Sequence, residues 1–381
     1  MNTMGSSGFE IGINLVKTVL VFLMMVQAVP ILVWLERRGS AFIQNRFGPN
    51  RIGPLGLLQL LADAVKFLHK EDFVPDKGNR FLFYMAPVFA LIPAAVAYMA
   101  IPMSTPLIIG DSKFLIQGYE VNVGIVFILG ISAMAVYTML MAGWGSSSKF
   151  SLMGAMRASA QVISYELALG LAIVGVILTY GTFNLTEMIL AQQGPLRFSG
   201  LGFEFISPTS FLPNWGIFFQ PLGALLFFAA TFAESNRLPF DLAEGEAELV
   251  AGFHTEYGGF KMLMFFIGEY GHMMIAAGLM TTFYFGGYGI PGFSIQEIYQ
   301  IGFNIFGSEL AANIFNTVIH FLSYNIKFAL FLWIFIHVRW TLPRFRYDQL
   351  MDLGWKTMLP WALFNTILTA TVIFVAAQYK F

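Results

Sequence analysis

Residues 11–38 read IGINLVKTVLVFLMMVQAVPILVWLERR, an apolar run with one internal lysine that ends at Glu36, Arg37 and Arg38. About 20 consecutive apolar residues are enough for a helix to cross the hydrocarbon layer of a bilayer. A cleaved signal peptide would begin with a basic region, but residues 1–10 contain no Lys or Arg, and the charges follow the run instead. We therefore expect a membrane-spanning helix that is retained.

The composition agrees with lipid as the solvent of the chain. Of the 381 residues, 57% are hydrophobic and only 11% are charged, whereas soluble domains carry about 25% charge. Repeated apolar runs of span length predict one transmembrane domain over residues 1–381 rather than two or three soluble domains. The expected fold class is an all-α, polytopic integral membrane protein.

The apolar runs along the chain predict about eight spans. They lie near residues 11–35, 82–102, 121–143, 160–180, 216–233, 262–288, 316–338 and 357–377. Prolines at 30, 87, 93 and 221 fall within or beside these spans, where kinks are expected because neighbouring helices can satisfy the freed carbonyls.

The distribution of basic residues predicts the orientation of the spans. Of 21 Lys and Arg, sixteen lie in the linkers after spans one, three, five and seven, three lie on the other side, and Lys17 and Lys327 lie within spans. Short loops rich in Lys and Arg stay on the cytoplasmic or matrix side. Both termini are therefore expected outside.

Several kinds of site are disfavoured by the sequence. The chain has no cysteine, so it offers no thiolate for a metal or an iron–sulfur cluster. Its five histidines do not pair at helical spacing, which disfavours haem, and no Gly-rich nucleotide-binding fingerprint is present. A net charge of −1 argues against a nucleic-acid partner. No metal site is expected.

The linker after the first span predicts an amphipathic helix over residues 55–70. Apolar residues from Leu57 to Leu68 recur at helical spacing, while Gln59, Asp63, Lys66 and Lys70 form the opposite stripe. The run is too short to span, so we expect it to lie at the membrane interface. Whether this helix is more than a surface anchor stays open on these residues alone.

The linker at 234–261 is unusually acidic. On a helix, Asp241, Glu244 and Glu248 would share one face, and the repulsion between them would raise the pKa of some above about 4.3. Groups poised in this way can store and release protons near neutral pH. A solvated acidic loop is the alternative, although the apolar residues interleaved with the acids favour the functional interpretation.

Ionisable residues also occur at membrane depth. Glu166 in the fourth span and Glu269 in the sixth would each cost about 2.5–3.5 kcal/mol to insert, which suggests a proton path. Tyr165 and Tyr270 stand beside them and could extend it. Lys17 and Lys327 are weaker candidates because a lysine near a helix end can reach the interface.

Four stretches together resemble one family. They are WLERR at 34–38 leading to QNRFGPNRIGP at 44–54, LQLLADAVK at 58–66, AESNRLPFDLAEGEAELV at 233–250 and RWTLPRFRYDQL at 339–350. They are similar to the family of H subunits, also called subunit 1, of the proton-pumping NADH:quinone oxidoreductase, respiratory complex I. The resemblance covers nearly the whole chain, in order.

The resemblance implies a quinone-channel subunit that couples quinone reduction to proton translocation and contains no redox centre of its own. The implied quinone-channel residues are Glu36, Arg37, Arg46, Asp63 and Lys66. The implied proton-coupling residues are Glu234, Arg237, Asp241, Glu244, Glu246, Glu248, Glu256, Glu269 and Glu166. The residues implied to face the peripheral arm are Arg339, Arg344, Arg346 and Asp348.

The same resemblance implies the substrate and the partners. The substrate would be a quinone, either ubiquinone or menaquinone, with no flavin, iron–sulfur cluster or haem bound by this chain. The partners would be the other membrane-arm subunits, the peripheral-arm quinone-site and iron–sulfur subunits, and membrane lipid. Long outer linkers at 103–120 and 181–215 favour a bacterial inner membrane over a mitochondrial one.

Three other functions compete with this one. A cation/proton antiporter would be expected to show internal repeats, and none is evident. The homologous membrane subunit of a membrane-bound hydrogenase shares the scaffold without quinone chemistry, and remains the main alternative. A purely structural anchor does not explain carboxylates held against apolar sequence.

Overall fold

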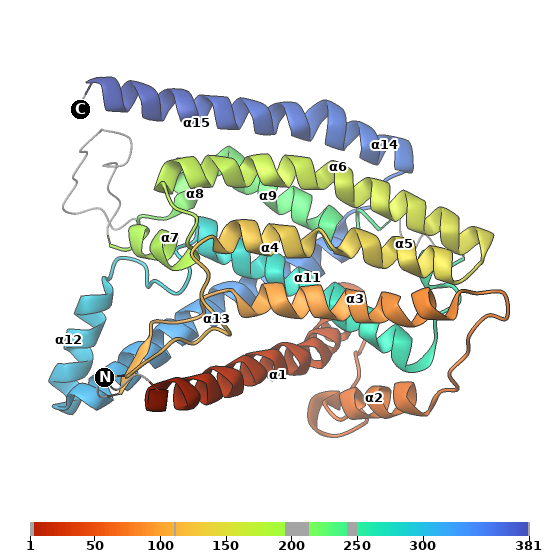
Figure 1. The fold of residues 1–381 in the computed structure, drawn as a ribbon, viewed down its shortest axis with the longest axis horizontal. Coiled ribbons are helices and arrows are strands. Elements are labelled where there is room, and N and C mark those ends of the chain that lie inside the picture. The colour runs from red at the N-terminus through yellow and green to blue at the C-terminus, as the bar shows by residue number, and fades with distance from the viewer. Residues whose placement is uncertain (1–3, 110–111, 195–212, 242–249, 380–381) are drawn as a thin grey trace.

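The computed structural model describes residues 4–109, 112–194, 213–241 and 250–379 as a bundle of long helices (Figure 1). The only sheet in these ranges is a hairpin of β1 (Leu107–Ile109) and β2 (Ser112–Phe114). The all-α, polytopic membrane class predicted from the sequence is confirmed.

Seven helical segments in the described ranges are long and apolar enough to cross a membrane. They are α1 (Met4–Ile43), α3 (Arg80–Met99), the pair α4 (Gly124–Ser132) and α5 (Ala135–Gly145), α6 (Lys149–Tyr180), α11 (Gly259–Tyr284), α13 (Glu309–Thr341), and the run of α14 (Tyr347–Asp352), the π-helical η4 (Leu353–Met358) and α15 (Leu359–Tyr379).

The span predicted at 216–233 is divided into two short helices. These are α8 (Gly216–Phe219) and α9 (Pro221–Glu234), which meet at Gln220. Proline is suited to the first turn of a helix because it has no N–H to donate. The buried Gln220 side chain donates to Thr369 Oγ1 at 2.7 Å and accepts from Asn365 Nδ2 at 3.0 Å, which ties the break to α15.

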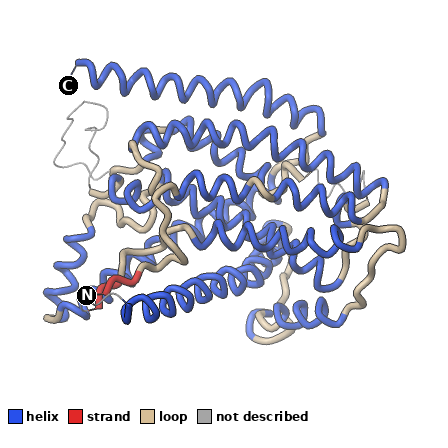
Figure 2. The backbone as a smooth tube through the Cα atoms, in the orientation of Figure 1, coloured by secondary structure: helices blue, strands red, loops and turns tan. Residues whose placement is uncertain are grey.

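The loops gather at the two ends of the bundle (Figure 2). One end holds both chain termini, the β1–β2 hairpin, α7 (Leu185–Ala191) and the surface helix α12 (Ile295–Phe306). The opposite end holds α2 (Gln59–His69) and the described parts of the linker between α9 and α11, residues 235–241 and 250–258 (Figure 1). This second end carries most of the Lys and Arg residues.

The amphipathic helix predicted at 55–70 is shorter than expected. A 3-10 turn, η1 (Pro54–Gly56), precedes α2, which begins at Gln59. Leu61 on its outer face is 65% exposed and Leu68 is 61% exposed. An apolar face of this kind is suited to lipid or to a partner subunit.

Close approach of α11 to α3 fixes the helix that carries Glu269. A Cβ on Gly268 would lie 2.7 Å from the carbonyl oxygen of Ala90, and one on Gly271 would lie 2.9 Å from the Cβ of Ala94. Small residues permit such approach between membrane helices. The turn around Glu269 is therefore held against its neighbours by backbone packing.

Candidate functional site

A chamber of about 430 Å³ lies between α1, α2, α11 and α13 at the basic end of the bundle. Most of its wall is apolar, from residues such as Val29, Phe67 and Phe266, and Ala64 of α2 lines it on one side. Its polar side chains are those of Glu36, Arg37, Ser40, Asp63, Tyr270 and Arg339. An apolar cavity with a few convergent polar groups is typical of a small-molecule site.

Glu36 is the centre of a buried polar cluster on the chamber wall. It is 7% exposed, and its Oε2 accepts a hydrogen bond from the Tyr270 hydroxyl at 2.7 Å and pairs with Arg237 Nη1 at 3.1 Å. Its Oε1 pairs with Arg339. The carboxylate is therefore compensated from three elements: α11, α13 and the linker after α9.

Arg237 connects Glu36 to a second carboxylate. Its Nε lies 2.9 Å from Glu269 Oε1, and its guanidinium covers the Tyr270 ring at 4.1 Å from the centroid. Burial lowers the pKa of Arg237, but the carboxylates of Glu269 and Glu36 raise it well above the ordinary value overall. Arg237 thus carries a fixed positive charge between two acids.

Two further ion pairs flank this cluster. Arg37 Nη1 lies 2.5 Å from Asp63 Oδ2, and Gln59 Nε2 donates to Asp63 Oδ1 at 3.0 Å, which joins α1 to α2. Arg344 Nη2 lies 3.1 Å from Asp241 Oδ2. Because Arg37 is about half exposed, we expect its pair to orient α2 more than to stabilise the fold.

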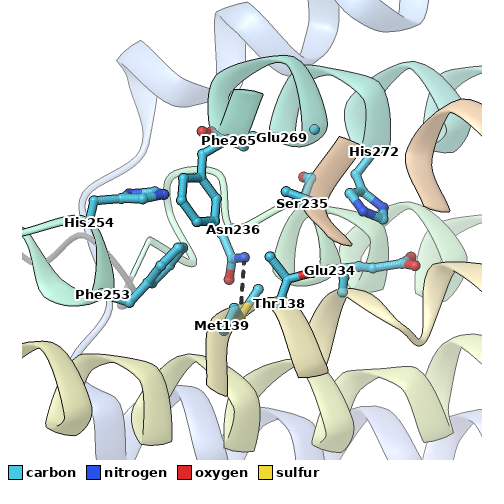
Figure 3. A pocket seen from close by; sticks show the side chains of 13 residues that line it. Thr138, Met139, Glu234, Ser235, Asn236, Phe253, His254, Phe265, Glu269 and His272 are labelled. Atoms are coloured by element: carbon cyan, nitrogen blue, oxygen red, sulfur yellow. Dashed lines mark hydrogen bonds between the residues drawn. The ribbon is translucent and has the colours of Figure 1, made fainter. Parts of the chain in front are cut away.

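A second, smaller pocket lies on the other side of Glu269. It has a volume of about 50 Å³ and is lined by Glu234 of α9, Glu269 and His272 of α11, and Thr138 of α5. Figure 3 shows Glu234 and His272 on the same side of it. The charge of Glu234 interacts with that of Glu166 of α6.

The structure brings together some of the predicted site residues and separates others. Glu36, Arg37 and Asp63 line the chamber, whereas Arg46 and Lys66 lie outside its lining, and Arg46 Nε donates to Gln44 Oε1 at 2.7 Å. Glu256 is half-buried in the linker after η3 (Gly252–His254). Arg346 and Asp348 lie at the start of α14, outside both cavities.

Part of the acidic linker falls outside the described residues. Glu244, Glu246 and Glu248 lie within 242–249, so their predicted shared helical face stays a prediction. Of the acids in that linker, Glu234, Asp241 and Glu256 are described, and they lie in different places. Asp241 pairs with Arg344, while Glu234 faces the smaller pocket.

Two residues considered for the proton path have other partners. Lys327 Nζ donates to the carbonyls of Phe285, Gly287 and Gly289 at 2.9, 2.9 and 2.5 Å, so it caps the end of α11 rather than meeting an acid. The Tyr165 hydroxyl donates to the Leu350 carbonyl at 2.8 Å. Tyr270, in contrast, does extend the cluster, through Glu36.

Sequence reasoning missed some lining residues. Trp340 and Phe266 line the chamber and His272 lines the smaller pocket, and none of the three was predicted. One signal was available for His272, because it follows Glu269 by three residues and must share its helix face. In the described ranges, no three His, Asp or Glu side chains form a metal-binding group.

The fold and this site define a class: a polytopic helical membrane protein with an apolar chamber and buried ion pairs at one end of the bundle. A sequence model of the NADH dehydrogenase family matches residues 16–370. The chain is 67% identical to the H subunit of NADH-quinone oxidoreductase from Bdellovibrio bacteriovorus, over 98% of this chain and 99% of that relative.

More distant relatives carry similar names. Identity is 42% to an H subunit of NADH-quinone oxidoreductase from Cytophaga hutchinsonii, over 89% of this chain and 90% of the relative. It is also 42% to subunit 8 of the Rhodothermus marinus enzyme, over 91% of this chain and 93% of that relative. The chain belongs to the H-subunit family of NADH-quinone oxidoreductase, and is a membrane subunit of that multi-subunit enzyme, complex I.

Proposed function

We propose that the 430 Å³ chamber is the entrance and part of the binding site for the quinone, and that this subunit couples quinone reduction to proton translocation. The observation that carries the proposal is the position of the Glu36–Arg237–Glu269 cluster. It has one carboxylate on the chamber wall and the other on the smaller pocket.

The chemistry of the chamber is suited to a quinone. Its apolar wall between α1, α2 and α11 would accept a ring and an apolar tail. The guanidinium groups of Arg37 and Arg339 supply donors for the ring oxygens. Electrons would come from iron–sulfur subunits of the peripheral arm, because this cysteine-free chain offers no thiolate ligand for a cluster.

Quinone reduction and proton movement would be coupled because Glu36 and Glu269 share the guanidinium of Arg237. Reduction of a quinone to a quinol takes up two electrons and two protons, so negative charge develops in the chamber before the protons arrive. Glu36 and that charge would then compete for Arg237 and Arg339. A weaker hold of Arg237 on Glu269 would make Glu269 more basic, so that it binds a proton.

The surroundings of the subunit follow from the same proposal. The acidic linker and Arg344, Arg346 and Asp348 would face the peripheral arm, while the bundle contacts the other membrane-arm subunits and lipid. The bacterial relatives support a location in the bacterial plasma membrane. No flavin, haem, iron–sulfur cluster or metal is assigned to this chain.

Glu269→Gln tests the coupling, because glutamine keeps the size of the side chain but cannot bind the proton. In the intact enzyme reconstituted in vesicles, we expect proton translocation to fall at least about tenfold, since a positioned proton-transfer group contributes about 10²–10⁴-fold. The measurement is the pH change per NADH oxidised.

Glu309→Gln is the matched control. Glu309 lies in the first turn of α13 at the opposite end of the bundle, so this variant should translocate protons as the unmodified enzyme does. Normal translocation by Glu269→Gln would refute the proposed coupling.

A further inference from the structure

The smaller pocket can hold water. Its volume is about 50 Å³, and one water needs about 10–15 Å³ of such space. Thr138, which lines it, is 5% exposed, and its hydroxyl has no hydrogen-bond partner among the described residues. Buried polar groups in native proteins are nearly always paired with protein or with water. Bound water would pair this hydroxyl.

Titratable side chains face this pocket from three elements. Glu269 and His272 come from one face of α11, Glu234 comes from the end of α9, and His254 comes from η3. Two charges outside the pocket interact with these side chains. Arg237 forms an ion pair with Glu269, and the charge of Glu166 interacts with Glu234. Glu269 and Glu234 are thus two acids on one water-sized cavity, and His272 lines the same cavity.

Histidine at this place has a chemical advantage over a second amide or hydroxyl. An imidazole can accept a proton on one ring nitrogen and release one from the other. Figure 3 shows the His272 ring on the same side of the pocket as the Glu234 carboxylate. Glu269 is about one helical turn away on α11.

We propose that His272 is a proton-transfer residue that links Glu269 to Glu234 through water in this pocket. The imidazole takes the proton that Glu269 releases and gives a proton from its other nitrogen to Glu234, so that no net charge stays on the ring. Glu166 of α6, which acts on Glu234, then lies next on the path. This inference rests on the proposed coupling function and adds to it a residue of the path.

The test is His272→Gln in the intact reconstituted enzyme. Glutamine keeps a polar side chain in the pocket but cannot carry a proton. We expect NADH-driven proton translocation to fall at least about tenfold. We also expect the pH profile of the remaining activity to change, because the variant has no imidazole to carry protons. A packing role alone would not change that profile.

His320→Gln is the matched control. His320 is also buried in a membrane helix, but its Nδ1 lies 2.8 Å from the carbonyl of Asn316, outside both cavities. It should keep the unmodified rate and pH profile. If His272→Gln does not accumulate in the membrane, His272→Asn provides the same test with a smaller amide.

The outcomes separate this inference from the coupling on which it rests. Normal translocation and pH profile in His272→Gln, with loss in Glu234→Gln and Glu269→Gln, would overturn the role of His272 and leave the coupling intact. Normal translocation in Glu269→Gln would overturn the coupling itself. Loss in all three, with His320→Gln unaffected, is the result expected here.

Discussion

At the scale of single residues, Arg237 is a buried charge that depends on its ion-pair partners. Its side chain is 5% exposed, and it is shared by Glu36 and Glu269. Removing one partner of a buried ion pair costs about 3–5 kcal/mol, because the other charge is left without compensation. Here a single removal would leave two acids with less compensation.

Arg237→Gln is therefore expected to lower the stability of the assembled enzyme by about 3–5 kcal/mol and to reduce quinone reductase activity. The measurement is thermal inactivation of the purified complex, together with the rate of quinone reduction. Arg344→Gln is the comparison, because Arg344 is 36% exposed in its pair with Asp241. This variant should therefore lose much less stability. Equal stability of the two variants would contradict the central place of Arg237.

The residues of this cluster could be predicted from the sequence as functional, but the ion pairs between them could not. Glu36, Arg237, Glu269 and Arg339 were all expected to be functional, yet they lie on four separate segments. Hydropathy and motifs give no distance between such segments. The pairs Glu36–Arg339 and Glu36–Arg237 follow from helix packing, which only the three-dimensional structure provides.

At the scale of elements, α2 forms one side of the chamber, and its other face is exposed. Ala64 lines the chamber, whereas Leu61 is exposed on the outside. The Arg37–Asp63 pair holds the helix against α1. Substitutions on the two faces of α2 should therefore have different effects.

Ala64→Trp is expected to fill the chamber and to lower quinone reductase activity at least about tenfold, which corresponds to about 1.4 kcal/mol. Leu61→Trp adds the same ring outside the chamber and should keep near-normal activity. The measurement is the KM and kcat for a short-tailed quinone. If both variants behaved alike, the space beside Ala64 would not be the binding site.

Predicted spans fall short of the observed helices where polar residues continue the helix. The span expected at 160–180 belongs to α6, which begins at Lys149. Lys149, Ser151 and Arg157 lower the local hydropathy without interrupting the helix. The surface helix α12 was not anticipated, although Ser294 and Glu297 form a capping box at its start.

At the scale of the whole molecule, the end that holds α2 is basic, and the end that holds the termini is not. Sixteen of the 21 Lys and Arg residues lie in the linkers assigned to the α2 end. By the positive-inside rule, that end is expected to face the cytoplasm. The chamber would then open on the side where the peripheral arm delivers electrons.

Labelling of single cysteines tests this orientation, because the chain has no cysteine of its own. Lys77, in the linker between α2 and α3, and Gln300, in α12, are both exposed. These two elements lie at opposite ends of the bundle (Figure 1). We expect Lys77→Cys to react with a membrane-impermeant maleimide only in inside-out vesicles, and Gln300→Cys only in right-side-out vesicles. The reverse pattern would invert the orientation and move the chamber to the outer face.

The central claim is that a quinone occupies the chamber between α1, α2, α11 and α13. Photo-crosslinking with an azido-quinone in native membranes, followed by peptide mapping, tests it most directly. A quinone bound in the chamber should place the label on residues 26–40 and 60–67, and excess unmodified quinone should remove it. Label confined to partner subunits would contradict it, and would favour a membrane subunit that serves proton movement without quinone contact, as in a membrane-bound hydrogenase.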